Sequence, residues 1–406
     1  MKVRTRPTLA ARALPMLLLC GALGAHAQQA QEEPFWAKGR PKNAVADKMA
    51  PVPAFPIPTP ADKLPIAKMK LPPGFKAEVF ASDILDARSM REGDKGTVFV
   101  SSLFVAGKLY AVVDNGGKRE VKVLAEKLFL PSGIEYHKGA LYLATPKDIT
   151  RYDNIEANLD KLPAPVMVYD KLPGEIPHGW KFIKVGPDNK LYVPVGAPCN
   201  ICEPDERFTR IFRMNLDGSG VEVVAQGMRN TVGFDFHPKT GQLWFTDNQR
   251  DWLSEDLPQD ELNVVTQPGK QHFGYPFCHA AGFADPQYGW GKNCADYTAP
   301  AALLGAHAAP LGMRFYTGKM FPAKYRDAIF IARHGPWNRT LKYAADIVVA
   351  YPDGKGGARI EPFLTGLVEN NEYLGRPADV MVMKDGSLLV SDDHNGAIYR
   401  ITYSGR

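Results

Sequence analysis

The amino-acid sequence predicts an all-β fold, a six-bladed β-propeller, on three observations. The 406 residues include 37 glycines and 34 prolines, a share typical of chains with many turns. After residue 30, no long segment places apolar residues at the 3.6-residue period of an amphipathic helix. A short β-type unit recurs six times. Apolar residues make up 45% of the chain and charged residues 23%, which excludes disordered, collagen-like and coiled-coil proteins.

The first 27 residues have the pattern of a secretory signal peptide. Four basic residues and no acidic ones accompany an apolar run at 13–20, and Ala25-His26-Ala27 is a suitable cleavage site. Cleavage there lowers the formal net charge from +5 to +1, which gives no support for a nucleic-acid partner. No later segment offers about 18 continuous apolar residues, so we expect no stable membrane insertion. The expected location is periplasmic or secreted.

Residues 28–70 form an N-terminal arm in our interpretation, because they contain eight prolines and show little periodicity. Such a segment is expected to be extended along the surface of the protein rather than to form a core of its own. The propeller is expected over residues 71–406.

The recurring unit is a turn rich in Gly, Asp and Lys, followed by a small residue and three or four apolar ones. Its six copies lie at 96–100, 139–143, 189–193, 241–245, 327–331 and 386–390. The reference positions Val98, Leu141, Leu191, Leu243, Ile329 and Leu388 are separated by 43, 50, 52, 86 and 59 residues. Four-stranded blades contain about 40–50 residues, so this spacing predicts six blades. The long fourth interval predicts an insertion at about 265–305.

Four cysteines follow the signal peptide, and an even number in an exported chain indicates disulfides. The expected pairs are Cys199–Cys202, within one loop, and Cys278–Cys294, which would staple the insertion. The first pair lacks the histidine of a haem-attachment motif and has no second CxxC to complete a zinc site. We therefore interpret both pairs as structural.

Polar residues stand near the ends of the expected hairpins. A residue about eight positions before the turn and one about six positions after it lie at the same edge of a blade. Sixfold repetition brings these positions together around one mouth of the central channel. They are His178, Arg229, Asn230, Arg376 and Arg88 before the turns, and Asn248, Gln249, Arg250, His334 and Asp393 after them. Each alone is typical of a strand end, but together they predict a polar ligand site.

Several motifs follow in a fixed order and spacing. They are Pro177-His178, Gly186-Pro187-Asp188-Asn189, Gly227-Met228-Arg229-Asn230, Asp260-Glu261-Leu262-Asn263 and Phe273-Gly274-Tyr275-Pro276. This set resembles the soluble quinoprotein sugar dehydrogenases. The branch of sorbosone dehydrogenase type is similar in Thr246-Asp247-Asn248, His334-Gly335-Pro336-Trp337 and Gly375-Arg376-Pro377. The resemblance extends from about Leu71 to Tyr403.

The resemblance implies a propeller that binds pyrroloquinoline quinone (PQQ) and Ca²⁺ and oxidises a sugar or a sugar-derived aldehyde or alcohol. It also implies that His178 is the general base and Arg229 the cation beside the quinone oxygen. The implied cofactor contacts are Asn230, Asn248, Asp260, His334 and Arg376. Gln249-Arg250 stands where the family has a Gly-Pro whose backbone carbonyls hold calcium. A periplasmic cytochrome or quinone is the expected electron acceptor.

The chemistry of these residue types agrees with that activity. A hydride leaves a carbinol carbon only when the hydroxyl proton is removed, which a neutral imidazole does well near pH 7. Arginines and a bound cation would stabilise the charge that builds on the cofactor.

Two other functions remain open from the sequence. A calcium-dependent hydrolase of the lactonase type would use the same mouth, but it needs several carboxylate or amide ligands from different blades. A non-catalytic ligand-binding propeller would keep the site without turnover, and the replacement at Gln249-Arg250 leaves that possibility open.

Overall fold

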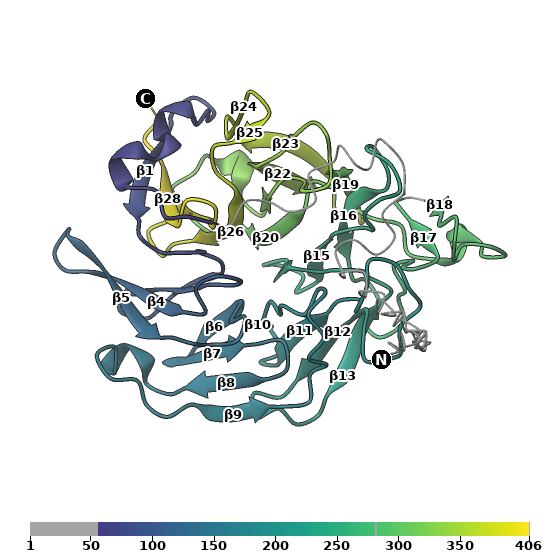
Figure 1. Ribbon diagram of the computed structural model, residues 1–406, viewed down its shortest axis with the longest axis horizontal. Helices are drawn as coiled ribbons and strands as arrows, with labels where there is room; N and C mark the ends of the chain where they lie inside the picture. Colours follow the sequence, from purple (N-terminus) through teal and green to yellow (C-terminus); the bar gives the residue numbers. More distant parts are fainter. Residues whose placement is uncertain (1–55, 281, 406) are drawn as a thin grey trace, which may run out of the picture. The chain divides into compact units, whose positions relative to one another are not determined.

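The computed structural model describes residues 56–280 and 282–405. The expected signal peptide and the arm up to residue 55 lie outside these residues. Six four-stranded antiparallel sheets succeed one another along the described chain and surround a common axis (Figure 1). This arrangement is a six-bladed β-propeller, so the fold class predicted from the sequence is confirmed.

The blades are numbered along the chain, with their strands given from the axis outward. Blade 1 contains β2 (Met90–Glu92), β3 (Val98–Ser101), β4 (Leu109–Asp114) and β5 (Arg119–Ala125). Blade 2 contains β6 (Gly133–His137), β7 (Ala140–Ala144), β8 (Ile149–Tyr152) and β9 (Val166–Tyr169). Blade 3 contains β10 (Lys184–Val185), β11 (Leu191–Val195), β12 (Arg210–Met214) and β13 (Glu222–Gln226).

The second half of the ring is built in the same way. Blade 4 contains β14 (Gly233–Phe236), β15 (Leu243–Asp247), β16 (Gln259–Val264) and β19 (Ala302–Ala306). Blade 5 contains β20 (Pro310–Phe315), β21 (Ile329–Arg333), β22 (Asp346–Pro352) and β23 (Ala358–Leu364). Blade 6 contains β26 (Pro377–Val382), β27 (Leu388–Asp392), β28 (Ala397–Tyr403) and, as its outermost strand, β1 (Phe75–Ala81).

The six repeated units of the sequence correspond to the second strands of the six blades: β3, β7, β11, β15, β21 and β27. These strands are almost entirely buried, because both of their faces pack against neighbouring blades. Burial on both faces explains why each unit is a continuous apolar run rather than an alternation of apolar and polar residues.

The ring is closed by pairing between the two ends of the described chain. β1 runs antiparallel to β28, with Phe75 opposite Tyr403 and Glu78 opposite Arg400 (Figure 1). Blade 6 therefore takes three strands from the C-terminal part of the chain and one from the N-terminal part.

The segment between β16 and β19 contains a small two-stranded sheet, β17 (Cys278–His279) and β18 (Phe283–Ala284), and the short helix η5 (Cys294–Asp296). The disulfide Cys278–Cys294 joins the sheet to this helix. Cys199 and Cys202 form the second disulfide, in the loop after β11, so both expected pairs are present.

The other short elements are β24 (Val368–Glu369), β25 (Glu372–Tyr373), η2 (Ala61–Lys63), η3 (Pro65–Lys68), η4 (Ile155–Ala157) and η6 (Ala323–Tyr325). Among the described residues, no helix has the length and apolar character needed to cross a membrane.

Apolar clusters fill the spaces between adjacent blades, and charged residues meet near the axis. Arg91 and Arg314 place their guanidinium carbons 5.1 and 4.9 Å from the ring centre of Phe182. Asp379 lies 3.2 Å from Arg314, and Glu135 pairs with Arg91. These five side chains are almost completely buried, so the axis is a packed core at this level.

Candidate active site

Loops at one end of the blades enclose a cavity of about 410 Å³, a size typical of small-molecule sites. Its walls come mainly from loops that precede the innermost strand of a blade or follow the second strand. Both kinds of loop lie at the same end because neighbouring strands are antiparallel. The structure brings to this cavity eight of the nine residues that the resemblance assigns to the site: His178, Arg229, Asn230, Asn248, Gln249, Asp260, His334 and Arg376.

His178 lies in the loop before β10 with its ring held in one orientation. Its Nδ1 is 2.8 Å from the carbonyl oxygen of Ala197. Because a carbonyl oxygen can only accept, Nδ1 carries the hydrogen and Nε2 of the neutral ring keeps a lone pair. Burial, and next the charge of Arg229, lowers the pKa of His178 well below its ordinary value of 6.5. The imidazole is therefore neutral near pH 7.

The backbone of this loop is fitted closely to His178. The residue has a φ of +53°, an uncommon conformation for a residue with a side chain, and one that clusters at functional sites. The facing residue is Gly196, where a Cβ would lie only 2.7 Å from the Cβ of His178. The absence of a side chain at position 196 therefore leaves room for the side chain of His178.

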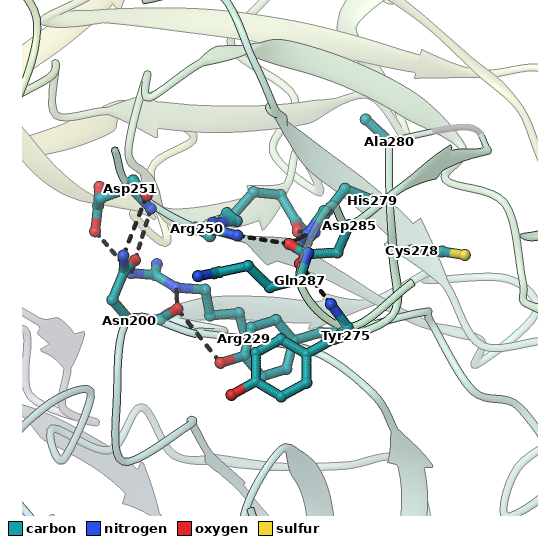
Figure 2. A network of polar contacts seen from close by, with 12 residues as sticks. Asn200, Arg229, Arg250, Asp251, Tyr275, Cys278, His279, Ala280, Asp285 and Gln287 are labelled. Atoms are coloured by element: carbon teal, nitrogen blue, oxygen red, sulfur yellow. Dashed lines mark hydrogen bonds and ion pairs between the residues drawn. The ribbon is translucent and has the colours of Figure 1, made fainter. Parts of the chain in front are cut away.

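Arg229 precedes β14 and is only 3% exposed. Its Nε and Nη2 donate to the carbonyl oxygen and Oδ1 of Asn200, at 2.8 and 2.9 Å (Figure 2). Nη2 also donates to Oδ2 of Asp251 at 2.7 Å, and Nη1 to the carbonyl oxygen of Asn248 at 3.1 Å. Four of the five N–H groups therefore have protein acceptors, and the guanidinium plane is fixed in the cavity wall.

Arg376, in the loop before β26, is buried and forms no direct ion pair within the described residues. Its Nε and Nη2 donate to the carbonyl oxygens of His334 and Gly335, at 3.1 and 2.7 Å. Within residues 56–280 and 282–405, no carboxylate oxygen lies within the 4.0 Å ion-pair distance of its guanidinium. Asp393 and Asp392 act on this guanidinium electrostatically from beyond that distance. A buried cation without a direct ion pair is costly, so this site favours an anionic ligand.

His334 differs from His178 in its hydrogen bonding. Its Nε2 lies 2.8 Å from Oδ1 of Asp393, whose Oδ2 accepts a hydrogen bond from Nη1 of Arg88 at 2.7 Å. Burial lowers the pKa of His334 to about 4, so the neutral ring donates from Nε2 to Asp393 near pH 7. Nε2 of His334 is therefore bonded to Asp393, whereas Nε2 of His178 has no protein partner among the described residues.

Asn248 is oriented by two backbone acceptors. Its Nδ2 donates to the carbonyl oxygens of Asn230 and Pro310, at 3.0 and 3.1 Å, which leaves its Oδ1 for the cavity. Asp260, on β16, accepts the N–H groups of Gln249 and Ala309, both at 2.8 Å. Burial raises the pKa of Asp260 to about 8.

Arg250 is the predicted site residue that does not line the cavity. Its Nη1 donates to Oδ2 of Asp285 at 2.8 Å, in the inserted segment (Figure 2). The Gln249 side chain is also engaged there, with Oε1 2.8 Å from Nδ1 of His279. Both side chains thus tie the site loop to the insertion. The role expected for the two backbone carbonyls, calcium ligation, stays a prediction, and the described residues contain no cluster of three or more His, Cys, Asp or Glu able to hold a metal.

Aromatic side chains form the remaining wall. Trp180 packs edge-to-face against Phe104 with ring centres 5.0 Å apart. Trp337, in the loop after β21, also lines the cavity. Phe104 is 53% exposed. A cavity with aromatic walls and a few convergent charges suits a flat, anionic ligand.

The sequence analysis missed two residues that hold Arg229. Asn200 lies between Cys199 and Cys202, a pair that we interpreted from the sequence only as a structural disulfide. Asp251 follows Asn248-Gln249-Arg250 directly, so its position after the strand was the available signal.

Comparisons with known proteins agree with this architecture. A family model described as TrAA12-like matches residues 69–404. A protein of Borreliella burgdorferi, described as uncharacterized, is 33% identical over 354 residues, which are 82% of this chain and 91% of that protein. The holo form of the PQQ domain of pyranose dehydrogenase from Coprinopsis cinerea is 20% identical with a TM-score of 0.70, covering 82% of this chain and 97% of that one. A calcium structure of a Trichoderma reesei protein of carbohydrate-active enzyme family AA12 is 19% identical with a TM-score of 0.71, covering 86% and 100%.

Proposed function

The chain belongs to the TrAA12-like family, and from that membership we propose that it oxidises a sugar, or a sugar-derived aldehyde or alcohol, by hydride transfer to PQQ. The observation that carries the proposal is the pairing of two features in one cavity. One is a neutral histidine with a free Nε2, His178, and the other is a buried arginine without a direct ion pair, Arg376.

The cavity residues fit the cofactor. PQQ is a planar tricarboxylate. Arg376 supplies a cation without a direct ion pair, and Arg229 supplies a second cation in the cavity wall. Asn230, Asn248, Asp260 and His334 would complete the contacts. When bound, PQQ supplies an acceptor for two electrons and a hydrogen nucleus, chemistry that no side chain provides.

His178 performs the proton transfer in this proposal. The substrate hydroxyl would donate to Nε2 of His178, which would take its proton as the O–H bond breaks. Bound PQQ would accept the hydride from the carbon that carries this hydroxyl. The carbonyl oxygen of Ala197 accepts from Nδ1–H throughout and stabilises the imidazolium that forms. Arg229 and Arg376 stabilise the negative charge that the cofactor gains.

We further propose that Ca²⁺ binds near the backbone carbonyls of Gln249 and Arg250, and that a periplasmic cytochrome or quinone accepts the electrons. Export is supported by the two disulfides, which are typical of oxidising compartments. Substrates of sorbosone type are one class within this proposal.

A lactonase-type hydrolase is less well supported, because the cavity carboxylates are already engaged. Asp251 pairs with Arg229, and Asp393 pairs with both Arg88 and His334. A hydrolytic metal needs several free oxygen ligands from different blades.

Reconstitution tests the proposal. The purified apo-protein is titrated with PQQ, with and without Ca²⁺, and reduction of a dye is followed with a panel of aldoses, sugar aldehydes and polyols. We expect saturable PQQ binding, and dye reduction that His178→Ala slows by about 10²–10⁴-fold. PQQ binding without turnover by any substrate supports the non-catalytic propeller instead, and metal-dependent lactone hydrolysis supports the hydrolase.

A further inference from the structure

The disulfide loop 199–202 lies against the cavity in an arrangement that a simple staple does not require. Asn200, between the two cysteines, is 6% exposed and lines the cavity. Its backbone and side chain both point to Arg229 (Figure 2). The loop therefore presents Asn200 to an arginine of the site.

Asn200 contacts Arg229 through a two-point fork. The carbonyl oxygen accepts from Nε at 2.8 Å and Oδ1 accepts from Nη2 at 2.9 Å, so one edge of the guanidinium is fixed in both position and plane. Few residues can do this, because the fork needs a short side chain with an acceptor close to its own carbonyl.

The same amide also holds the counter-ion of Arg229. Oδ1 of Asn200 accepts the backbone N–H of Asp251 at 2.7 Å, and its Nδ2 donates to the Asp251 carbonyl oxygen at 3.1 Å. Asp251 then pairs with Nη2 of Arg229 at 2.7 Å. Asn200 is thus the common partner of both members of this buried ion pair.

Asn200 itself is held from two sides. The disulfide Cys199–Cys202 closes the loop around it. On the other side, the hydroxyl of Tyr275, at the start of the inserted segment, donates to the Asn200 carbonyl oxygen at 3.3 Å and accepts from the N–H of Cys202 at 3.1 Å. Both ends of the loop are therefore fixed relative to the site.

We propose that Asn200 is a positioning residue that fixes Arg229 for the cofactor, and that the Cys199–Cys202 disulfide and Tyr275 serve to hold Asn200. The inference rests on the proposed function, in which Arg229 contacts PQQ. A residue that acts only through Arg229 loses its effect when Arg229 is absent, and this gives the test.

The test is a double-mutant cycle on PQQ affinity, measured by titration of apo-protein. Asn200→Ala is compared in the wild-type and Arg229→Met backgrounds. We expect Asn200→Ala to weaken PQQ binding about tenfold in the wild-type background, within the range for neighbouring residues, and by less than about twofold beside Arg229→Met. Thermal unfolding of each apo-variant checks that it is folded.

A second pair of variants tests the disulfide. Replacing Cys199 and Cys202 by serine should weaken PQQ binding in the same conditional way, whereas replacing Cys278 and Cys294 by serine should leave PQQ affinity within about twofold. The latter is a matched control because it also removes one disulfide, while Tyr275 remains held by its N–H bond to Gly227.

The outcomes distinguish the two proposals. A wild-type protein that binds no PQQ overturns the proposed function and this inference with it. A wild-type protein that binds PQQ, with equal losses from Asn200→Ala in both backgrounds, overturns only the positioning role.

Discussion

Substitution of His178 by alanine and by glycine separates the chemistry of the imidazole from the strain of its backbone. Both changes remove Nε2, so kcat should fall by about 10²–10⁴, the usual contribution of a positioned base. Both also remove the hydrogen bond that Nδ1–H of His178 donates to the carbonyl oxygen of Ala197. This loss should lower the free energy of unfolding by about 1 kcal/mol. Only glycine relieves the φ of +53°, so His178→Gly should be about 1 kcal/mol more stable than His178→Ala.

The assay measures dye reduction at saturating PQQ and Ca²⁺, PQQ affinity by titration, and stability by urea unfolding of the apo-protein. PQQ affinity should change little, because the imidazole acts on the substrate. Burial and Arg229 lower the pKa of His178, so the acid limb of the wild-type kcat/KM profile should lie below pH 6.5.

The control is His334→Ala, because Nε2 of His334 is hydrogen-bonded to Asp393 and is not available as a base. This variant should change PQQ affinity more than it changes the acid limb of the pH profile. Near-normal kcat in His178→Ala, or loss of turnover only in His334→Ala, would refute the assignment. Equal stability of the alanine and glycine variants would refute the reasoning about strain.

Three further predictions use other parts of the structure. Arg376→Met should weaken PQQ binding by about 1.5–3 kcal/mol, because it removes a buried cation that has no direct ion pair in the protein. Unchanged titration curves would exclude Arg376 from the cofactor site. Burial raises the pKa of Glu261 from 4.5 to about 8. Between these two pH values the folded protein keeps a proton on Glu261 that the unfolded chain has lost. The free energy of unfolding therefore falls as the pH rises through this range. Glu261→Gln should reduce that fall, by on the order of 1 kcal/mol for each pH unit, in urea unfolding at several pH values. Replacing Cys278 and Cys294 by serine should lower the free energy of unfolding by about 3 kcal/mol. Thiol counting of the denatured protein without its expected signal peptide should find no free thiol.

The propeller was predictable because its second strands are buried on both faces. Val98, Leu191 and Leu388 begin apolar runs that follow turns rich in Gly, Asp and Lys, and sixfold repetition makes this weak local signal strong. The outermost strands gave no such signal. β1 pairs with a strand at the other end of the chain, and such pairing depends on the closure of the whole ring.

The candidate site was predictable to the extent that it follows from the repeat. His178, Arg229 and Arg376 stand before innermost strands, and the antiparallel order of the strands brings them to one end. The repeat says nothing about the direction of a side chain within its loop. Arg250 turns to Asp285 because the insertion supplies that carboxylate, and Asn200 reaches Arg229 because its loop is folded back by a disulfide.

In blade 6, β1 and β28 pair like the two strands of a β-hairpin, but no turn connects them. Glu78 and Arg400 are neighbours although 322 positions separate them, and Ser404 donates its N–H to the carbonyl oxygen of Gly74 at 3.0 Å. Closing a loop of this length costs about 4 kcal/mol more than closing a hairpin turn of about four residues. We therefore expect the seam between these strands to form last as the ring closes and to separate first as it opens. A circular permutant that links residue 404 to residue 74 by a tight turn, with new ends in another blade, would move this seam without changing any strand.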